Sequence, residues 1–326
     1  MMSDGANEVL ASAGDEESFF FSSDGEDLVG VVTRPFPGHS PADASVALVP
    51  GGWLGLSSGR NRTLVRLARR LAGDGLQALR FEYRGVGDST GSITRFELAR
   101  PFVADLRAAL QRSGLSSPRP LFLVGFCFGA RTALPLAGEL PNVRGLVLVA
   151  APVHDGGVRA RWERTLAQRA TARRLGSLFL RPTLIRDAFR PERRRFLRTY
   201  IGAKLTTLRR RLLSSRSRAS EGEVVSPAFI EQLKTALELD IPVLFVFGTT
   251  DAAYREFAEA LETPTLGALV KNGSLVDVIE IEGDVHGLGR VRVQEDVIDV
   301  IAKWVGRRAR SSSKPVPSGG PIARRR

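Results

Sequence analysis

Short apolar runs recur along this chain and are separated by stretches with a different pattern. Continuous apolar runs are typical of strands that are buried on both faces of a sheet. They occur as SVALVPGG (45–52), LQALRFEY (76–83), PLFLVGF (120–126), VRGLVLVAAPV (143–153), IPVLFVFGTTD (241–251) and SLVDVIEIEG (274–283). Each of these runs predicts one strand.

The stretches between the runs have helical spacing. In RNRTLVRLARRLAGDG (60–75), apolar residues recur near a period of 3.6 and glycines close the stretch. Further helices are predicted over 95–112, interrupted by Pro101, and over 127–140, 252–262 and 292–305. Strands that alternate with helices predict an α/β fold, in which helices cover both faces of a mostly parallel sheet.

The segment SFFFSSDGEDLVGVVTRP (18–35) has two β-rich runs around Asp-Gly-Glu. This pattern predicts a hairpin, which would add antiparallel strands at one edge of the sheet.

The alternation breaks after the sixth strand. Residues 156–226 are rich in Arg and predict helices, with a stripe formed by Leu197, Ile201, Leu205, Leu208 and Leu212. An insertion at this point would cover the carboxyl ends of the strands, where such sheets bind ligands. The predicted domains are a disordered tail (1–17), an α/β core (18–155 and 227–306), an Arg-rich helical cap (156–226) and a disordered basic tail (307–326).

The net charge of +12 is concentrated in the predicted cap. Residues 156–220 contain 18 Arg and one Lys against three acidic residues, so they carry +16 and the rest of the chain carries −4. Arg on helices is often a solvated face, and a nucleic-acid or membrane surface is another interpretation. No nucleic-acid motif or aromatic stacking platform accompanies the charge, so no nucleic acid is expected. We expect an anionic partner: an acyl carrier protein, coenzyme A or an acidic substrate.

The remaining composition is that of a soluble protein, with 43% hydrophobic and 25% charged residues. A single cysteine excludes an internal disulfide and favours the reducing cytoplasm. The acidic N-terminal stretch lacks the features of a secretory signal, and no apolar stretch is long enough to span a bilayer. No metal or cofactor is predicted.

The single cysteine lies in Gly125-Phe126-Cys127-Phe128-Gly129, between a predicted strand and a predicted helix. This arrangement matches a nucleophile elbow with Cys in place of Ser, in which small residues are needed two positions before and after the nucleophile. At the N-terminus of the helix, a thiolate is favoured by the helix dipole and free N–H groups. The alternative is a small thiol that packs under the sheet.

A thiol nucleophile needs a base, and the chain offers His39, His154 and His286. The order nucleophile, acid, histidine along the chain selects His286, which follows the last strand. Asp251, at the end of the penultimate strand, is the predicted acid. Asp284 is the alternative, although its place on the same loop as His286 is more typical of a carboxylate that braces the loop.

An oxyanion hole completes such a site. The backbone N–H of Phe128, directly after the nucleophile, is one predicted donor. The second is the N–H of Gly52 or of Trp53, in the loop VPGGWLG after the third strand.

These residues resemble the α/β-hydrolase superfamily, over about residues 18–306. RFEYRGVGDS resembles the turn after its fourth strand, and GFCFGA, FGTTD and GDVHG follow its catalytic order. The stretch from Gly51 to Gly91 is similar to exosortase-system-associated hydrolases and their acyl-transferring or thioesterase-like relatives. Members of that group also carry Cys at the elbow, as dienelactone hydrolases and polyhydroxyalkanoate synthases do. The Arg-rich cap has no counterpart in this resemblance.

Two functions follow as hypotheses. The first is a Cys-His-Asp enzyme that cleaves or transfers an acyl group from an ester or thioester through an S-acyl intermediate, with hydrolysis and transfer both open. The second is an inactive binding or scaffold protein on the same fold that uses its basic cap.

Overall fold

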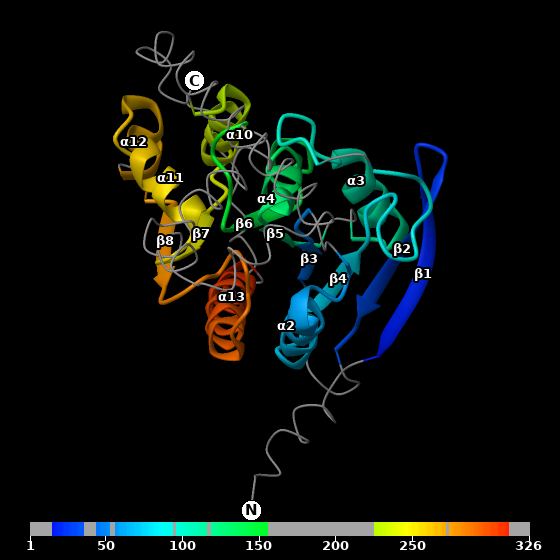
Figure 1. Ribbon diagram of the computed structural model, residues 1–326. Coiled ribbons are helices and arrows are strands. Elements are labelled where there is room, and N and C mark those ends of the chain that lie inside the picture. Colours follow the sequence, from blue (N-terminus) through cyan, green and yellow to red (C-terminus); the bar gives the residue numbers. More distant parts are fainter. Residues whose placement is uncertain are drawn as a thin grey trace, which may run out of the picture. The chain divides into compact units, whose positions relative to one another are not determined.

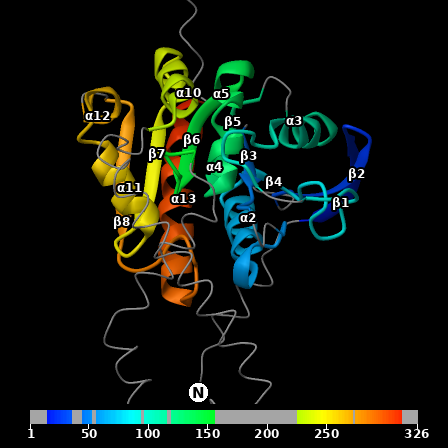
Figure 2. The same ribbon diagram turned by 45° about the horizontal axis from the view of Figure 1, so that its top comes forward.

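The apolar runs form the strands of one sheet, which has eight strands in the described part of the chain. The spatial order is β1-β2-β4-β3-β5-β6-β7-β8, which Figure 1 shows from right to left. Figure 2 shows the part from β4 to β8 from another side. The strands are β1 (Glu16–Ser23), β2 (Glu26–Thr33), β3 (Ser45–Val49), β4 (Gln77–Phe81), β5 (Leu121–Phe126), β6 (Val143–Val149), β7 (Val243–Gly248) and β8 (Val276–Ile281). The pairs from β4 through β8 are parallel, as the continuous apolar runs predict.

The computed structural model describes residues 15–35, 44–52, 56–93, 96–115, 119–155, 225–271 and 274–312. These residues belong to one compact unit, formed by the stretches of chain on either side of residues 156–224. The predicted cap therefore lies outside the described residues, except for Val225 and Ser226. No helix in the described ranges is long and apolar enough to cross a membrane.

The predicted hairpin forms the antiparallel edge of the sheet. β1 pairs with β2, and β2 pairs with β4, both antiparallel. Asp24 and Gly25 connect β1 to β2, and both have positive φ, at 48° and 84°. An Asp-Gly turn of this type matches the twist of the two strands, which is why the short polar stretch makes a tight hairpin.

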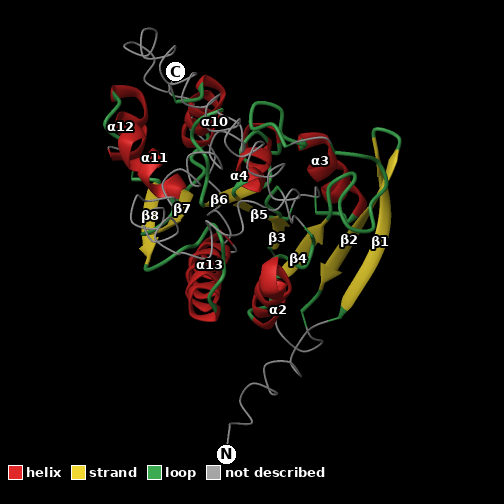
Figure 3. Ribbon diagram, in the orientation of Figure 1, coloured by secondary structure: helices red, strands yellow, loops and turns green. Residues whose placement is uncertain are grey.

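Helices cover both faces of the sheet, as predicted (Figures 1 and 3). α2 and α13 pack together on one face, and the other face is covered by α3, α4, α5, α10 and α11. The helices are η1 (Arg60–Arg62), α2 (Thr63–Gly73), α3 (Val103–Arg112), α4 (Phe128–Ala133), α5 (Leu136–Glu139), α10 (Pro227–Glu238), α11 (Ala252–Ala260), α12 (Pro264–Lys271) and α13 (Val291–Ser312).

Two predicted helices have different bounds in the structure because of prolines. The helix expected over 95–112 begins only at Val103, because Pro101 and the cap residue Phe102 stand before its first turn. The helix expected over 127–140 is divided into α4 and α5 at Pro135, which becomes the cap residue of α5.

The ordered core extends beyond the predicted limits at both ends. β1 begins at Glu16, two residues inside the predicted tail, where Glu16 forms ion pairs with Arg69 and Arg80. α13 continues to Ser312, six residues into the predicted C-terminal tail. There the guanidinium of Arg308 stacks over the Trp304 ring at 3.9 Å. These contacts hold polar terminal residues against the folded core, and the composition of the two tails does not predict them.

The boundary after the insertion also moves. Ser226, assigned to the predicted cap, is the cap residue of α10, and its hydroxyl accepts a hydrogen bond from the N–H of Phe229.

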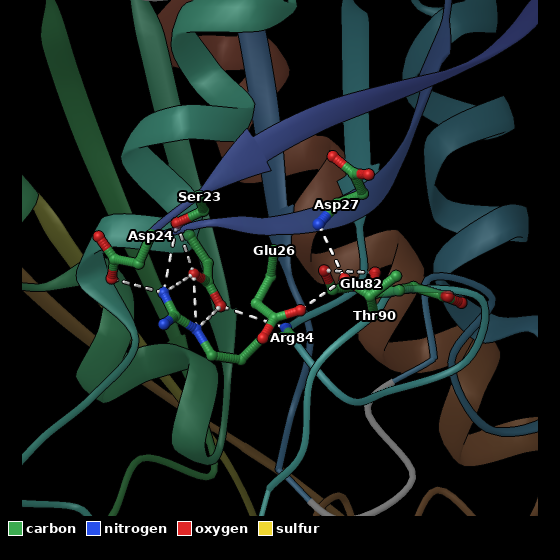
Figure 4. A network of polar contacts seen from close by, with 9 residues as sticks. Ser23, Asp24, Glu26, Asp27, Glu82, Arg84 and Thr90 are labelled. Carbon is green, nitrogen blue, oxygen red and sulfur yellow. Dashed lines mark hydrogen bonds and ion pairs between the residues drawn. The ribbon is translucent and has the colours of Figure 1, made fainter.

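A polar network holds the turn after β4 against the hairpin (Figure 4). Arg84 donates to the carboxylates of Asp24 and Asp105 and to the hydroxyl of Ser23. Thr90 lies in the same turn as Arg84, and its hydroxyl donates to the carboxylate of Glu26 at the start of β2. Because Asp105 is fully buried, its pairing with Arg84 fixes the turn tightly to α3.

The crossing from β5 to α4 depends on two glycines. A Cβ on Gly125 would lie 2.4 Å from the carbonyl oxygen of Gly129. A Cβ on Gly129 would lie 2.3 Å from the carbonyl oxygen of Val49 and 2.5 Å from that of Pro50. Backbone therefore packs directly on backbone at both positions, and no side chain fits there.

Replacing Gly129 with Ala should lower the free energy of unfolding by about 3 kcal/mol, because the new methyl group would clash with two carbonyl oxygens. Gly73 provides the matched control, since a Cβ there meets nothing within 4 Å. Gly73→Ala should stabilise the protein by about 0.5 kcal/mol. Chemical denaturation measures both, and equal effects would contradict the close approach at Gly129.

Candidate active site

Cys127 occupies the turn between β5 and α4 in a backbone conformation that is rare for a residue with a side chain. Its φ is 49° and its ψ is −109°, and it precedes the first residue of α4. Its N–H donates to the carbonyl oxygen of Val149 on β6 at 2.8 Å. Such a conformation costs about 1–3 kcal/mol and persists only where the surroundings impose it. The close packing of Gly125 and Gly129 provides that constraint.

His286 meets the thiol from the loop between β8 and α13. The Nε2 atom of His286 lies 3.2 Å from the Sγ atom of Cys127. The two residues are 159 positions apart in the chain, and the parallel sheet brings them together at the carboxyl ends of β5 and β8. At this distance the imidazole can accept the thiol proton.

Asp251 follows β7 and lies beneath the histidine loop. The residue is 2% exposed, and its Oδ2 atom accepts the N–H of Gly248 at 2.8 Å. Its carboxylate oxygens also accept the backbone N–H of His286, at 3.1 and 3.2 Å. The carboxylate therefore fixes the backbone that carries His286.

The environment of Asp251 opposes its ionisation. Burial raises the pKa of Asp251 to about 6, although the hydrogen bonds from the N–H groups of Gly248 and His286 lower it in part. The neighbouring carboxyl of Asp284 also raises this pKa, through a hydrogen bond and through its charge, and the value of about 6 is the net result of all these causes.

Asp284, the alternative acid, also contacts the histidine loop. Its Oδ1 atom accepts the N–H of Gly287 at 2.7 Å. The guanidinium of Arg60 donates to the carbonyl oxygen of Gly287 at 2.6 Å. The sequence carries no signal for the contact from Arg60, because it joins residues 227 positions apart.

The loop after β3 lies beside the thiol. A Cβ on Gly51 would lie 4.0 Å from the Cβ of Cys127, and one on Gly52 would lie 3.5 Å from the Cβ of Phe128. Phe128 is the first residue of α4, where the backbone N–H has no partner within the helix. The structure thus brings together Gly52, Phe128 and Cys127.

Three further residues were predicted or considered for the site, namely Trp53, His39 and His154. Trp53 and His39 lie outside the described residues. His154 follows β6 and is 8% exposed. Across the described ranges, no group of three or more His, Cys, Asp or Glu residues could hold a metal ion.

Comparison of the sequence with protein families gives a match over most of the core. A family model described as the alpha/beta hydrolase family matches residues 46–284. This range includes Cys127 and Asp251 and ends two residues before His286. Among curated proteins, none matches this chain.

Solved structures share the fold at low sequence identity. An esterase of Pyrococcus furiosus is 14% identical, with a TM-score of 0.55, 94% of this chain covered and 95% of the other. The esterase domain of a Rhodothermus marinus protein is 17% identical, with a TM-score of 0.50 and coverage of 90% and 99%. The proline iminopeptidase of Mycobacterium smegmatis is 16% identical, with a TM-score of 0.50 and coverage of 91% and 100%. At these identities the likeness concerns the fold alone.

The predicted fold class is confirmed by the sheet order, the helices on both faces and the family match together. This chain belongs to the alpha/beta hydrolase family.

Proposed function

We propose that this protein cleaves or transfers an acyl group from an ester or thioester, with Cys127 as the nucleophile. The observation that carries the proposal is the distance of 3.2 Å between Sγ of Cys127 and Nε2 of His286. The imidazole takes the thiol proton while the sulfur attacks the carbonyl carbon. The tetrahedral intermediate then expels the alcohol or thiol, which leaves with the proton from His286, and an S-acyl enzyme remains.

The second half of the reaction uses the same groups. His286 removes a proton from water or from another acceptor, which attacks the S-acyl carbonyl and releases Cys127. A thioester intermediate suits transfer as well as hydrolysis, because an amine or thiol competes with water for it. The reaction needs a reduced thiol, so a reducing compartment such as the cytoplasm suits this enzyme.

The oxyanion that forms during attack needs hydrogen-bond donors. We assign these to the N–H of Phe128 and to the N–H of Gly52 or Trp53. The proximity of Gly52 to Phe128 supports this assignment. The resemblance of residues 51–91 to exosortase-system-associated hydrolases, which also carry Cys at the elbow, supports the choice of a thiol nucleophile.

We assign the acid role to Asp251. An ionised carboxylate stabilises the imidazolium that forms when His286 holds the thiol proton. Two observations support this role: Asp251 is buried, and both of its carboxylate oxygens accept the backbone N–H of His286. Asp284 acts on Asp251, since it raises the pKa of that carboxyl, and it braces the loop at Gly287.

Replacing Cys127 with Ala should abolish turnover of ester and thioester substrates, by at least about 10⁴-fold in kcat, while the fold persists. Cys127→Ser should keep the fold but react poorly, because the site holds a thiol whose proton is removed far more easily than that of a hydroxyl. Circular dichroism checks the fold. Full activity of Cys127→Ala would overturn the mechanism, and an inert wild-type thiol would favour the binding-protein alternative.

The two carboxylates should respond differently to amide substitution. Asp251→Asn should lower kcat/KM by roughly 10³-fold at neutral pH, whereas Asp284→Asn should cost less than about tenfold. In the wild type, kcat/KM should decline as the pH falls through about 6, where Asp251 takes up a proton. Asp284→Asn should move this decline to lower pH, because it removes a group that raises the pKa of Asp251.

The pH profiles of the wild type and both variants provide the measurement. A severe loss in Asp284→Asn with a mild loss in Asp251→Asn would show that the acid assignment is wrong. A decline that stays at the same pH in Asp284→Asn would contradict the coupling of the two carboxyls.

We also propose that the acyl group reaches the enzyme on an anionic carrier, such as an acyl carrier protein or coenzyme A. The support comes from the sequence, since residues 156–220 hold 18 Arg and one Lys against three acidic residues. In the chain this insertion follows β6, and sheets of this kind bind their ligands at the carboxyl ends of the strands.

The kcat/KM for a carrier-bound substrate should therefore fall with ionic strength, because salt screens charges beyond about 8 Å at physiological concentration. A neutral ester with the same acyl group should show no such slope. Replacing Arg193, Arg194 and Arg195 with Ala should flatten the slope for the charged substrate only. Equal slopes for both substrates, before and after the substitution, would show that the Arg-rich segment does not recognise the carrier.

A further inference from the structure

The loop that contributes to the assigned oxyanion hole contains two adjacent glycines, Gly51 and Gly52. Glycine has wide backbone freedom, so this pair does not hold one conformation by itself. An oxyanion hole, in contrast, works only if its donors are fixed before the charge develops. Something outside the glycine pair must therefore set its geometry.

The carbonyl oxygen of Pro50, directly before the pair, is held from two sides. The hydroxyl of Tyr83 donates to it at 3.1 Å. On the side of α4, a Cβ on Gly129 would lie only 2.5 Å from it, so the backbone of Gly129 packs against this oxygen. The peptide unit is planar, so fixing the Pro50 carbonyl also fixes the direction of the Gly51 N–H.

The same hydroxyl reaches the helix that follows the nucleophile. The Tyr83 oxygen lies 3.2 Å from the Oγ1 atom of Thr132. While Tyr83 donates to Pro50, the Thr132 hydroxyl can donate to the Tyr83 oxygen or to the carbonyl oxygen of Phe128, which is also 3.2 Å away. Tyr83 is fully buried, and its ring packs edge-on against Phe128 with centroids 5.7 Å apart. Burial holds the pKa of Tyr83 above its usual value, so the hydroxyl keeps the proton that it donates.

The far side of the loop is held by neighbours of Tyr83. The carboxylate of Glu82 accepts the N–H and the hydroxyl of Ser57, both at 3.1 Å. Arg80 donates to the carbonyl oxygen of Ser57 at 3.3 Å. The end of β4 thus fixes Pro50 and Ser57, which lie on either side of the glycine pair in the chain.

We propose that Tyr83 is a positioning residue for the oxyanion hole, because its hydroxyl ties the Pro50 carbonyl to α4 and so sets the Gly51-Gly52 backbone relative to the N–H of Phe128. This inference rests on the proposed function, since it concerns the stabilisation of charge on an acyl oxygen. Tyr83 does not touch the reacting atoms in this account. It acts through the backbone on both sides of the thiol.

A positioning role of Tyr83 should affect only one of two reactions of the Cys127 thiol. Acylation of Cys127 by an ester passes through an oxyanion, and it needs the donors in place. Alkylation of Cys127 by iodoacetamide is a displacement at carbon in which no oxyanion forms, so it reports only the reactivity of the thiol. Loss of the Tyr83 hydroxyl should therefore slow acylation and leave alkylation unchanged, whereas general damage to the site would slow both.

The experiment compares Tyr83→Phe with Tyr254→Phe in the full-length protein. Tyr254 is the matched control, because its hydroxyl contacts Glu280 on the outside of the core. The measurements are the single-turnover rate of acylation by a p-nitrophenyl ester and the rate of alkylation by iodoacetamide. Tyr83→Phe should acylate about 10- to 100-fold more slowly, with KM little changed, and should alkylate at the wild-type rate. Tyr254→Phe should match the wild type in both reactions.

Equal slowing of both reactions in Tyr83→Phe, or normal acylation, would overturn the positioning role. If Tyr83→Phe fails to fold, Glu82→Gln provides the second variant, because its amide keeps one acceptor oxygen while it weakens the hold on Ser57 and Asp88. It should slow acylation severalfold without changing alkylation, and equal effects on both would again overturn the inference. Failure of the proposed function has a different signature, since the wild type itself would then not be acylated at Cys127.

Discussion

The contact of backbone with backbone at the β5–α4 turn is the constraint on which the site depends. Gly125 packs against α4, and Gly129 packs against the carbonyl oxygens of Val49 and Pro50. This packing restricts the backbone conformation between the two glycines, and Cys127 adopts a φ of 49° there. The strain is localised at the residue whose side chain faces His286, and the same packing sets the helix start at Phe128 and the loop at Pro50.

Around this turn, the carboxyl end of the sheet joins three loops from distant parts of the sequence. The loop after β8 brings His286, the loop after β7 brings Asp251, and the loop after β3 brings Gly51. Polar contacts hold each loop: Tyr83 at Pro50, the Gly248 N–H at Asp251, and Asp251 with Asp284 at the His286 loop. Asp251 is the sharpest case, because burial raises its pKa to about 6 while the proposed chemistry needs its charge. The N–H groups of Gly248 and His286 offset part of that cost.

Much of this arrangement can be predicted from the sequence, because the patterns that indicate it lie in short, continuous stretches of the chain. Apolar runs predict the strands, Asp24-Gly25 predicts the hairpin, and the spacing of Gly125 and Gly129 around Cys127 predicts the turn. The family's chain order then points to His286, which the fold brings to 3.2 Å from the thiol. α10 and α12 were not predicted, since their short amphipathic stretches do not stand out from the neighbouring loops. The contacts of Tyr83, Arg60 and Arg308 were also out of reach, because each joins elements that only the folded sheet brings together.

The formation of an acyl bond to Cys127 is the central step of the proposed reaction. The direct measurement is peptide mass spectrometry of the protein after rapid acid quenching during turnover of a thioester. The proposed mechanism predicts that the peptide containing residue 127 gains the mass of the acyl group and loses it on treatment with hydroxylamine, which cleaves thioesters. Turnover with an acyl group on another residue, or with residue 127 never modified, would contradict it.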